Sequence, residues 1–203
     1  MTSEIRFEPL GRTARWSLTV SGETPAGTPR FPLTFDERPL KELPERVLLA
    51  GIVLAGPETT FEFNKPINQS LKAGMESIGL KITSKVSTPR LEGAVQATWM
   101  QVTTGLNVGH QTPNRDQTRL FLPPSERFQG RLVGLKEMVI ASNAAWLTQR
   151  HGPKIILASA LLFSADLLSK GLIIDGIDKD ENFRFYQELL KLENLELHSK
   201  SVH

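Results

Sequence analysis

The sequence predicts a mixed fold, either α+β or α/β, in which a β-rich N-terminal part is followed by a layered α/β unit. Near the N-terminus, apolar and polar residues alternate, which is typical of half-buried strands. Further along the chain, apolar residues recur every three or four positions, which is typical of amphipathic helices. We place the boundary after residue 64, so that residues 1–64 and 65–203 are the two parts of one compact domain.

The composition is that of a globular chain with a sizeable core. Of the 203 residues, 39% are hydrophobic and 23% are charged, which excludes disorder over the whole length. The chain has no cysteine, so disulfides, thiolate metal sites and cysteine nucleophiles are excluded, and we expect a reducing compartment such as the cytoplasm. The first residues lack the features of a signal peptide. The longest apolar stretch, at 155–168, is too short and too polar to span a membrane, so we expect no membrane partner.

The elements of the N-terminal part follow from this alternation. Residues 5–7 and 16–20 predict the first two strands, and residues 31–35 and 61–63 predict two more short ones. Residues 47–54 form a continuous apolar run ahead of a Gly-Pro pair. We interpret this run as a buried strand, with a short helix as the alternative.

In the second part, helical spacing begins at Ile67, and Pro66 suits a first turn. Ser125 and Asp178 are placed to cap later helices, and Glu181 stands where a capping box after Asp178 needs it. The expected elements are, in order, a helix at 67–78, a strand at 81–86, a helix at 91–103, a strand at 106–108, a long loop at 112–124, a helix at 125–146 interrupted near residue 143, a buried helix at 155–168, a strand at 172–174, a helix from 178 to 190, and a frayed end at 196–203.

Motifs of the common catalytic and nucleotide-binding sites are absent. Neither the GxxxxGK[ST] and GxGxxG phosphate loops nor GxSxG nor HExxH occurs. The four histidines have no metal-ligand spacing, and the acidic residues that follow the strand at 172–174 lack the pattern of a calcium loop. We therefore expect no metal site and no cofactor.

His110 is the weak candidate for a catalytic residue. It follows an expected strand, and α/β folds place their chemistry at the carboxyl ends of strands. A neutral imidazole there could act as a general base or hold a phosphate; the alternative is a surface histidine with no role. We interpret His151, in contrast, as the residue at a helix C-terminus, where a positive charge favours the dipole.

Charge is unevenly distributed, although the net charge is only +2. Residues 110–154 contain seven Lys or Arg side chains and three acidic ones, whereas residues 166–196 contain eight acidic and four basic ones. Basic side chains with interleaved aromatic rings can hold nucleic acid or phosphate, and Phe121 is the candidate ring; ordinary solvated surface charge is the alternative. The candidate binding residues are Lys85, Arg115, Arg119, Phe121, Arg127 and Arg131.

Three stretches carry a resemblance to a known family. They are residues 106–111 (Leu-Asn-Val-Gly-His-Gln), residues 155–176, which end in Leu-Ile-Ile-Asp-Gly, and residues 178–190. In this order they resemble the nucleotide-binding fold of the ATP-pyrophosphatase superfamily, especially 7-cyano-7-deazaguanine synthase-like proteins. The family's Ser-Gly-Gly-x-Asp-Ser loop would fall near residues 83–88, where this chain has Thr-Ser-Lys-Val-Ser-Thr, and the family's four zinc cysteines are missing. The resemblance therefore implies a degenerate, non-catalytic member, and no catalytic residue is carried over.

Three functions follow as hypotheses. The first is a non-catalytic binding or assembly subunit of a larger protein complex, contacting nucleic acid or a nucleotide through the basic central segment. The second is an enzyme acting on a nucleotide or phosphoester, with His110 as base and Arg115 or Arg119 holding phosphate. The third is a structural protein, for example a viral or shell component. Because no catalytic motif occurs, we favour the first.

Overall fold

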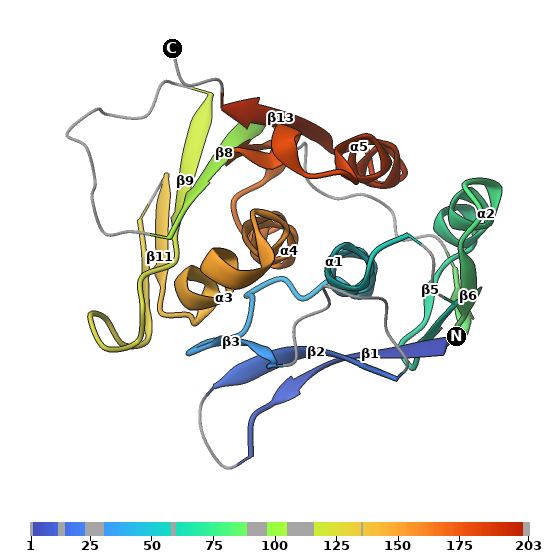
Figure 1. Ribbon diagram of the computed structural model, residues 1–203, viewed down its shortest axis with the longest axis horizontal. Helices are drawn as coiled ribbons and strands as arrows, with labels where there is room; N and C mark the ends of the chain where they lie inside the picture. The colour runs from blue at the N-terminus through green and yellow to red at the C-terminus, as the bar shows by residue number, and fades with distance from the viewer. Residues whose placement is uncertain are drawn as a thin grey trace.

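Two sheets enclose a layer of helices in the computed structural model, which describes residues 2–11, 15–22, 31–57, 60–88, 97–104, 116–134 and 136–200 (Figure 1). The helices are α1 (Pro44–Ala55), α2 (Gln69–Ser77), α3 (Ala144–His151), α4 (Lys154–Phe163) and α5 (Phe183–Lys191), with a 3-10 turn η1 (Ile177–Lys179). The strands are β1 (Thr2–Pro9), β2 (Trp16–Gly22), β3 (Leu33–Phe35), β4 (Thr60–Phe63), β5 (Ile67–Asn68), β6 (Lys81–Thr83), β7 (Val86–Ser87), β8 (Thr98–Thr103), β9 (Gln117–Phe121), β10 (Arg131–Val133), β11 (Glu137–Ile140), β12 (Ser169–Asp175) and β13 (Glu196–Lys200).

The N-terminal sheet has the strand order β3-β2-β1-β4-β6 and is mixed. β1, β2 and β3 pair antiparallel, whereas β1, β4 and β6 pair parallel. Alternation gives the sheet a buried face, which in β1 consists of Ser3, Ile5 and Phe7. Of the five strands predicted in this part, the four at 5–7, 16–20, 31–35 and 61–63 are confirmed, and the sheet continues past residue 64 to β6.

Helix α1 replaces the strand that we predicted at 47–54. Every residue from Glu45 to Ala55 is buried, so the continuous apolar run marks a helix that is covered on all sides. Pro44 stands in the first turn, where its fixed φ suits a helix start. At Gly51 the helix approaches β1 so closely that a Cβ would lie 2.5 Å from Cγ2 of Ile5. The prediction was wrong because an apolar run of eight residues fits a buried strand and a buried helix equally well.

The second sheet has the order β10-β11-β9-β8-β12-β13, and all its strands except β10 run parallel. The chain passes from β8 to β9 and β11 on one side and then returns to β12 and β13 on the other side of β8. This is the strand order of doubly wound folds, and it creates a topological switch point between β8 and β12. The molecule is thus mixed α/β, with a mixed N-terminal sheet and a largely parallel six-stranded sheet.

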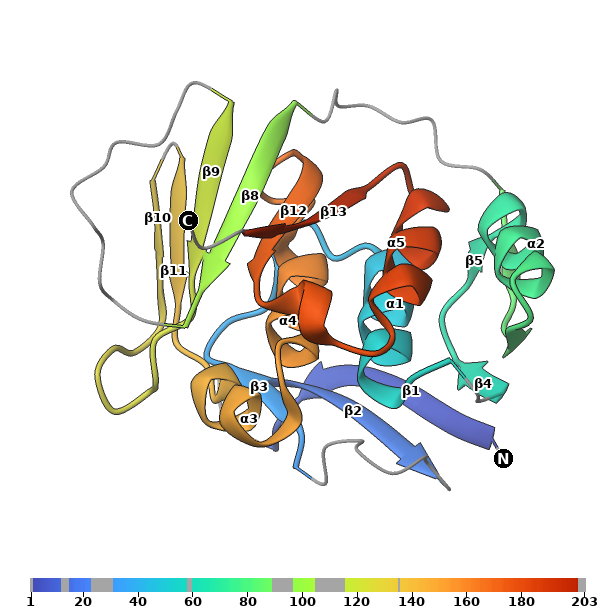
Figure 2. The same ribbon diagram turned by 45° about the horizontal axis from the view of Figure 1, so that its top comes forward.

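One layer of helices serves both sheets. Figure 2 shows α1, α3 and α4 between the N-terminal strands and the parallel sheet. Every residue from Ile155 to Phe163 is buried, and α4 packs against α1, α3, β8 and β12. The buried helix predicted here is confirmed, although it ends at Phe163. The other face of the parallel sheet, which we call the outer face, carries none of the described helices (Figure 1).

Several expected elements of the second part are wrong. Residues 98–103 form strand β8 and not the end of a helix, and residues 117–121 form strand β9 within the expected loop. Residues 131–140 form the hairpin β10–β11 and not a helix. Gly130, with φ of +76°, and Gly134 interrupt the helical spacing that suggested the helix, and glycine is a poor helix former.

The C-terminal end also differs from the prediction. Residues 196–200 form β13, the edge strand that pairs with β12, and are not frayed. Asp178 does not cap a helix, because its carboxylate accepts a hydrogen bond from the Ser199 hydroxyl of β13. Helix α5 begins at Phe183, and Asp180 accepts instead from the backbone N–H of Asn182 at 3.0 Å. The predicted strand at 172–174 is confirmed as β12. The helix predicted at 67–78 is present as α2, but it begins at Gln69, because Ile67 and Asn68 form strand β5 and Asn68 caps the helix.

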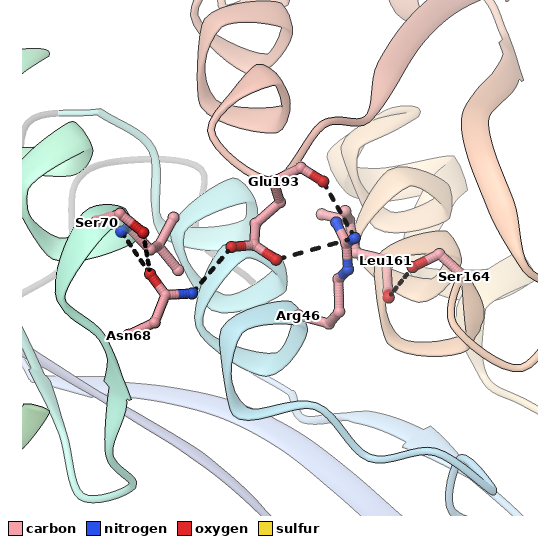
Figure 3. A network of polar contacts seen from close by, with 7 residues as sticks. Arg46, Asn68, Ser70, Leu161, Ser164 and Glu193 are labelled. Atoms are coloured by element: carbon pink, nitrogen blue, oxygen red, sulfur yellow. Dashed lines mark hydrogen bonds and ion pairs between the residues drawn. The ribbon is translucent and has the colours of Figure 1, made fainter. Parts of the chain in front are cut away.

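A buried ion pair links the two ends of the chain (Figure 3). Arg46 of α1 donates from Nη2 to the carbonyl oxygen of Glu193 at 3.3 Å and lies 3.9 Å from the Glu193 carboxylate. The same carboxylate accepts from Asn68, the residue that caps α2. Since the Arg46 side chain is only 3% exposed, its charge depends on this partner.

We predict that Glu193→Leu lowers the free energy of unfolding by about 3 kcal/mol, because it leaves the Arg46 charge buried without its counter-ion. The double variant Arg46→Met/Glu193→Leu recovers most of this loss, since no buried charge remains. Urea unfolding of the three proteins measures both effects. The control is Glu188→Gln on the exposed side of α5, which changes stability by less than about 0.5 kcal/mol. Equal losses for the single and double variants would contradict this role of the pair.

Candidate functional site

The structure separates the residues predicted to bind nucleic acid. Arg119 lies in β9, Arg127 in the turn that follows, and Arg131 at the start of β10. Lys85 lies between β6 and β7, and both views place β5 and β6 at the opposite side of the molecule from β9 and β11 (Figures 1 and 2). His110 and Arg115 lie outside the described residues.

Phe121 is 2% exposed and belongs to the buried side chains. Its ring is therefore not accessible for stacking on a base, which corrects the prediction. The segment compared with the phosphate loop, residues 83–88, is also misplaced, because Thr83 ends β6 of the N-terminal sheet and not a strand of the parallel sheet.

The outer face of the parallel sheet gathers polar and aromatic side chains in rows across the strands. Register pairs Arg119 of β9 with Gln101 of β8 and with Glu137 of β11, and Gln101 in turn with Ile173 of β12. The inner face is apolar, with Met100, Val102, Leu120, Met138, Ile140, Leu172 and Ile174 all buried. Among the described residues, the two faces of the sheet therefore differ in polarity.

Trp99 lies on this face near the amino-terminal end of β8. In register it lies opposite Gly171 of β12, and a Cβ at Gly171 would be 2.4 Å from Cζ3 of the indole. The ring therefore lies over the glycine and reaches β13, where His198 meets it edge-on at a centroid distance of 4.6 Å. Nζ of Lys170, at the bulge of β12, lies 5.6 Å from the indole centroid. Trp99 is only partly exposed, and His198 is exposed.

Ion pairs moderate the positive charge of the outer face. Arg119 Nη1 lies 3.5 Å from the Glu137 carboxylate, and the Arg119 side chain is 14% exposed. His198 Nε2 lies 3.4 Å from the Glu196 carboxylate. The Arg119 guanidinium is thus held by an acidic partner and is less available to a polyanion.

A pocket of about 760 Å³ opens at the carboxyl ends of β9 and β11. Its walls come from the turn after β9, from the start of α3 and from the N-terminal sheet, and they include Arg15, Ser125, Gln129, Trp146 and Gln149. Carboxyl ends of parallel strands are the usual ligand sites of α/β folds.

Titratable groups also meet at the carboxyl end of β12, where α4 begins. Burial lowers the pKa of Lys154, and the charges of Asp180 and Glu181 offset part of this effect. Burial raises the pKa of Tyr186, and the nearby charge of Asp180 raises it further. The groups come close together, but within the described ranges no three His, Asp or Glu side chains are placed to share a metal ion.

The chain matches no protein-family model, no curated protein and no solved structure. None of the helices in the described part of the chain is long and apolar enough to cross a membrane. The structure establishes a mixed α/β architecture with parallel strands. Membership in the ATP-pyrophosphatase superfamily stays a hypothesis.

Sequence reasoning missed Trp99, Lys170 and His198 as members of one surface. Trp99 was assigned to a helix and His198 to a frayed end. A short signal for β8 was present, since residues 100–103 alternate apolar and polar side chains in the run Met-Gln-Val-Thr.

We predict that Gly171→Ala lowers the free energy of unfolding by about 2 kcal/mol, because the new methyl group collides with the Trp99 ring. Trp99→Leu in the same chain restores most of the loss, since the smaller side chain leaves room. Chemical unfolding gives the coupling between the two positions. Gly134→Ala is the matched control, because its Cβ meets its nearest neighbour at an ordinary 3.5 Å. Additive effects of the two changes would show that the ring does not lie on Gly171.

We predict that Lys154→Met raises stability at neutral pH. Burial lowers the pKa of Lys154 in the folded protein. At neutral pH the lysine is protonated, and its buried charge destabilises the folded state. As the pH rises toward the ordinary value of 10.5, the wild-type lysine loses its proton and the difference between the two proteins shrinks. Unfolding curves at pH 7 and near pH 10 measure the change, with the exposed Lys191→Met as control. A gain that grows with pH would contradict the assignment.

Proposed function

We propose that the protein is a non-catalytic binding subunit that holds single-stranded nucleic acid on the outer face of its parallel sheet. The observation that carries the proposal is the position of Trp99, a partly exposed indole on a polar sheet face, with Lys170 and His198 beside its ring. Sheet faces that bind single strands combine aromatic rings for stacking with polar side chains for the base edges.

The neighbours of Trp99 supply the polar side chains that such a surface needs for the base edges. Gln101 and Gln117 lie on the same face and are partly exposed, and each amide can donate and accept hydrogen bonds. Arg119 and Lys170 supply donors for phosphate oxygens. This mixture of amides, cations and one ring fits a polynucleotide better than a protein partner, because protein interfaces are depleted of Lys and Glu and have an apolar centre.

The charges of the outer face favour a modest affinity for single-stranded nucleic acid. Because Glu137 and Glu196 already pair with Arg119 and His198, only a few phosphates can be neutralised. Each phosphate contact on a single strand contributes about −0.7 to the slope of log K against log salt concentration. We therefore expect a shallow slope of about −2.

The resemblance to the ATP-pyrophosphatase superfamily belongs to the same proposal. The order β11-β9-β8-β12-β13 is that of doubly wound nucleotide-binding folds, which supports the likeness. We propose a degenerate member of that superfamily that has kept the sheet and works by binding within a larger protein complex.

The test is titration of the full chain with a fluorescent single-stranded oligonucleotide at several salt concentrations. We predict that Trp99→Ala weakens binding about tenfold or more, since one stacked base contributes about 1–3 kcal/mol. Lys170→Ala is expected to weaken binding and to reduce the salt slope by about 0.7. Arg119→Ala is expected to change the slope less, because Arg119 already pairs with Glu137.

The matched control is Lys85→Ala, an exposed lysine of the β6–β7 segment. We expect it to change neither the affinity nor the slope. If Lys85→Ala reduces binding as much as Lys170→Ala, or if the wild-type chain binds no oligonucleotide, the outer face is not the binding surface.

A further inference from the structure

The pocket at the carboxyl ends of β9 and β11 is a separate feature from the outer face. Its volume of about 760 Å³ lies within the range of small-molecule sites. It is lined by residues from α3, which belongs to the helix layer on the inner side of the sheet (Figure 2). A ligand there would not touch Trp99.

Trp146 gives the pocket an aromatic wall that is fixed before any ligand arrives. The side chain is 40% exposed. Phe31 meets its ring edge-on at a centroid distance of 5.3 Å, and the guanidinium of Arg150 stacks on it at 4.2 Å. An indole held by two neighbours loses little side-chain entropy when a planar ligand stacks on it.

Hydrogen bonds within the protein hold together the segments that line the pocket. Asp36 accepts from the backbone N–H of Gly130 at 2.9 Å and from Nε of Arg15 at 3.1 Å. Asn143 accepts from the N–H of Thr34 and donates to the carbonyl oxygen of Pro32, both at 2.8 Å. These contacts tie the turn after β9 and the start of α3 to the N-terminal sheet, so both parts of the chain are needed to form the pocket.

The rim of the pocket offers both donors and acceptors. Gln129 and Gln149 are exposed amides, Glu126 is an exposed carboxylate, and Arg15 is a cation whose charge is shared with Asp36. With one cation already paired and one carboxylate on the rim, the pocket has no excess of positive charge. Such a pocket favours a neutral planar ligand over a phosphate group.

We propose that this pocket binds a nucleobase, free or as a nucleoside, with the ring stacked on Trp146 and the polar edge read by Gln129, Gln149 and Glu126. A nucleobase combines a flat aromatic surface with donors and acceptors along one edge, which matches the aromatic wall and the mixed rim. The proposal stands on different residues from the nucleic-acid surface, so either can fail alone.

The test follows the indole N–H signals of Trp16, Trp99 and Trp146 by NMR, each assigned with its Trp→Phe variant. Adenosine, guanosine and uridine are added separately, and free adenine and guanine separate the base from the nucleoside. We expect a saturable shift of the Trp146 signal alone. Inorganic phosphate and ribose 5-phosphate are expected to cause no shift.

Substitutions in the pocket test whether the nucleobase binds there. Gln149→Ala is expected to weaken binding about fivefold, the loss of one hydrogen bond. Gln69→Ala, an exposed glutamine at the start of α2, is the matched control and is expected to have no effect. For the Trp146 variants the Trp146 signal is lost, so their binding is read from the broadening of the nucleoside's own NMR signals on addition of protein. Trp146→Phe keeps a stacking ring and is expected to retain weaker binding, whereas Trp146→Ala is expected to abolish the broadening that the wild-type chain causes.

Three results would overturn the proposal. The first is the absence of any Trp146 shift with nucleosides or bases up to about 10 mM, a concentration at which a site with a Kd of about 1 mM would be mostly occupied. The second is an equal shift with phosphate alone, which would indicate an anion site. The third is a shift of Trp99 in place of Trp146, which would assign the bases to the outer face and support only the nucleic-acid surface.

Discussion

The contact between α1 and α4 is the constraint on which the rest of the structure depends. Both helices are buried along almost their whole length and are mostly apolar, and each can be buried only if sheets or helices surround it. The N-terminal sheet covers α1 and the parallel sheet covers α4, so a single helix layer satisfies both sheets. As a result the outer face of the parallel sheet carries none of the described helices, and this is the surface to which we assign a function.

Much of the fold followed from local patterns, and each failure has a physical cause. Strands at the N-terminus and helix α4 were predicted because alternation and continuous burial leave clear traces. The run at 47–54 was misassigned because burial on all sides removes the periodicity that distinguishes a helix from a strand. The hairpin at 131–140 was missed because its apolar residues fall at helical spacing, although Gly130 and Gly134 interrupt them.

The candidate sites were less predictable than the fold. Arg119 was found from its charge, but the neighbours that matter to it come from β8 and β11. Trp99 and His198 are almost a hundred residues apart in the chain, and only the order β8-β12-β13 brings them together. The pocket likewise joins the N-terminal sheet to α3. A sequence shows which side chains could bind, whereas register and strand order decide which of them share a surface.

The most direct test of the account is oxidative footprinting of the three tryptophans, read by mass spectrometry with and without a saturating single-stranded oligonucleotide. We predict that Trp99 reacts in the free protein and is protected in the complex, and that the oxidation of Trp146 does not change. Equal oxidation of Trp99 in both samples, or protection confined to Trp146, would contradict the assignment of nucleic-acid binding to the outer face.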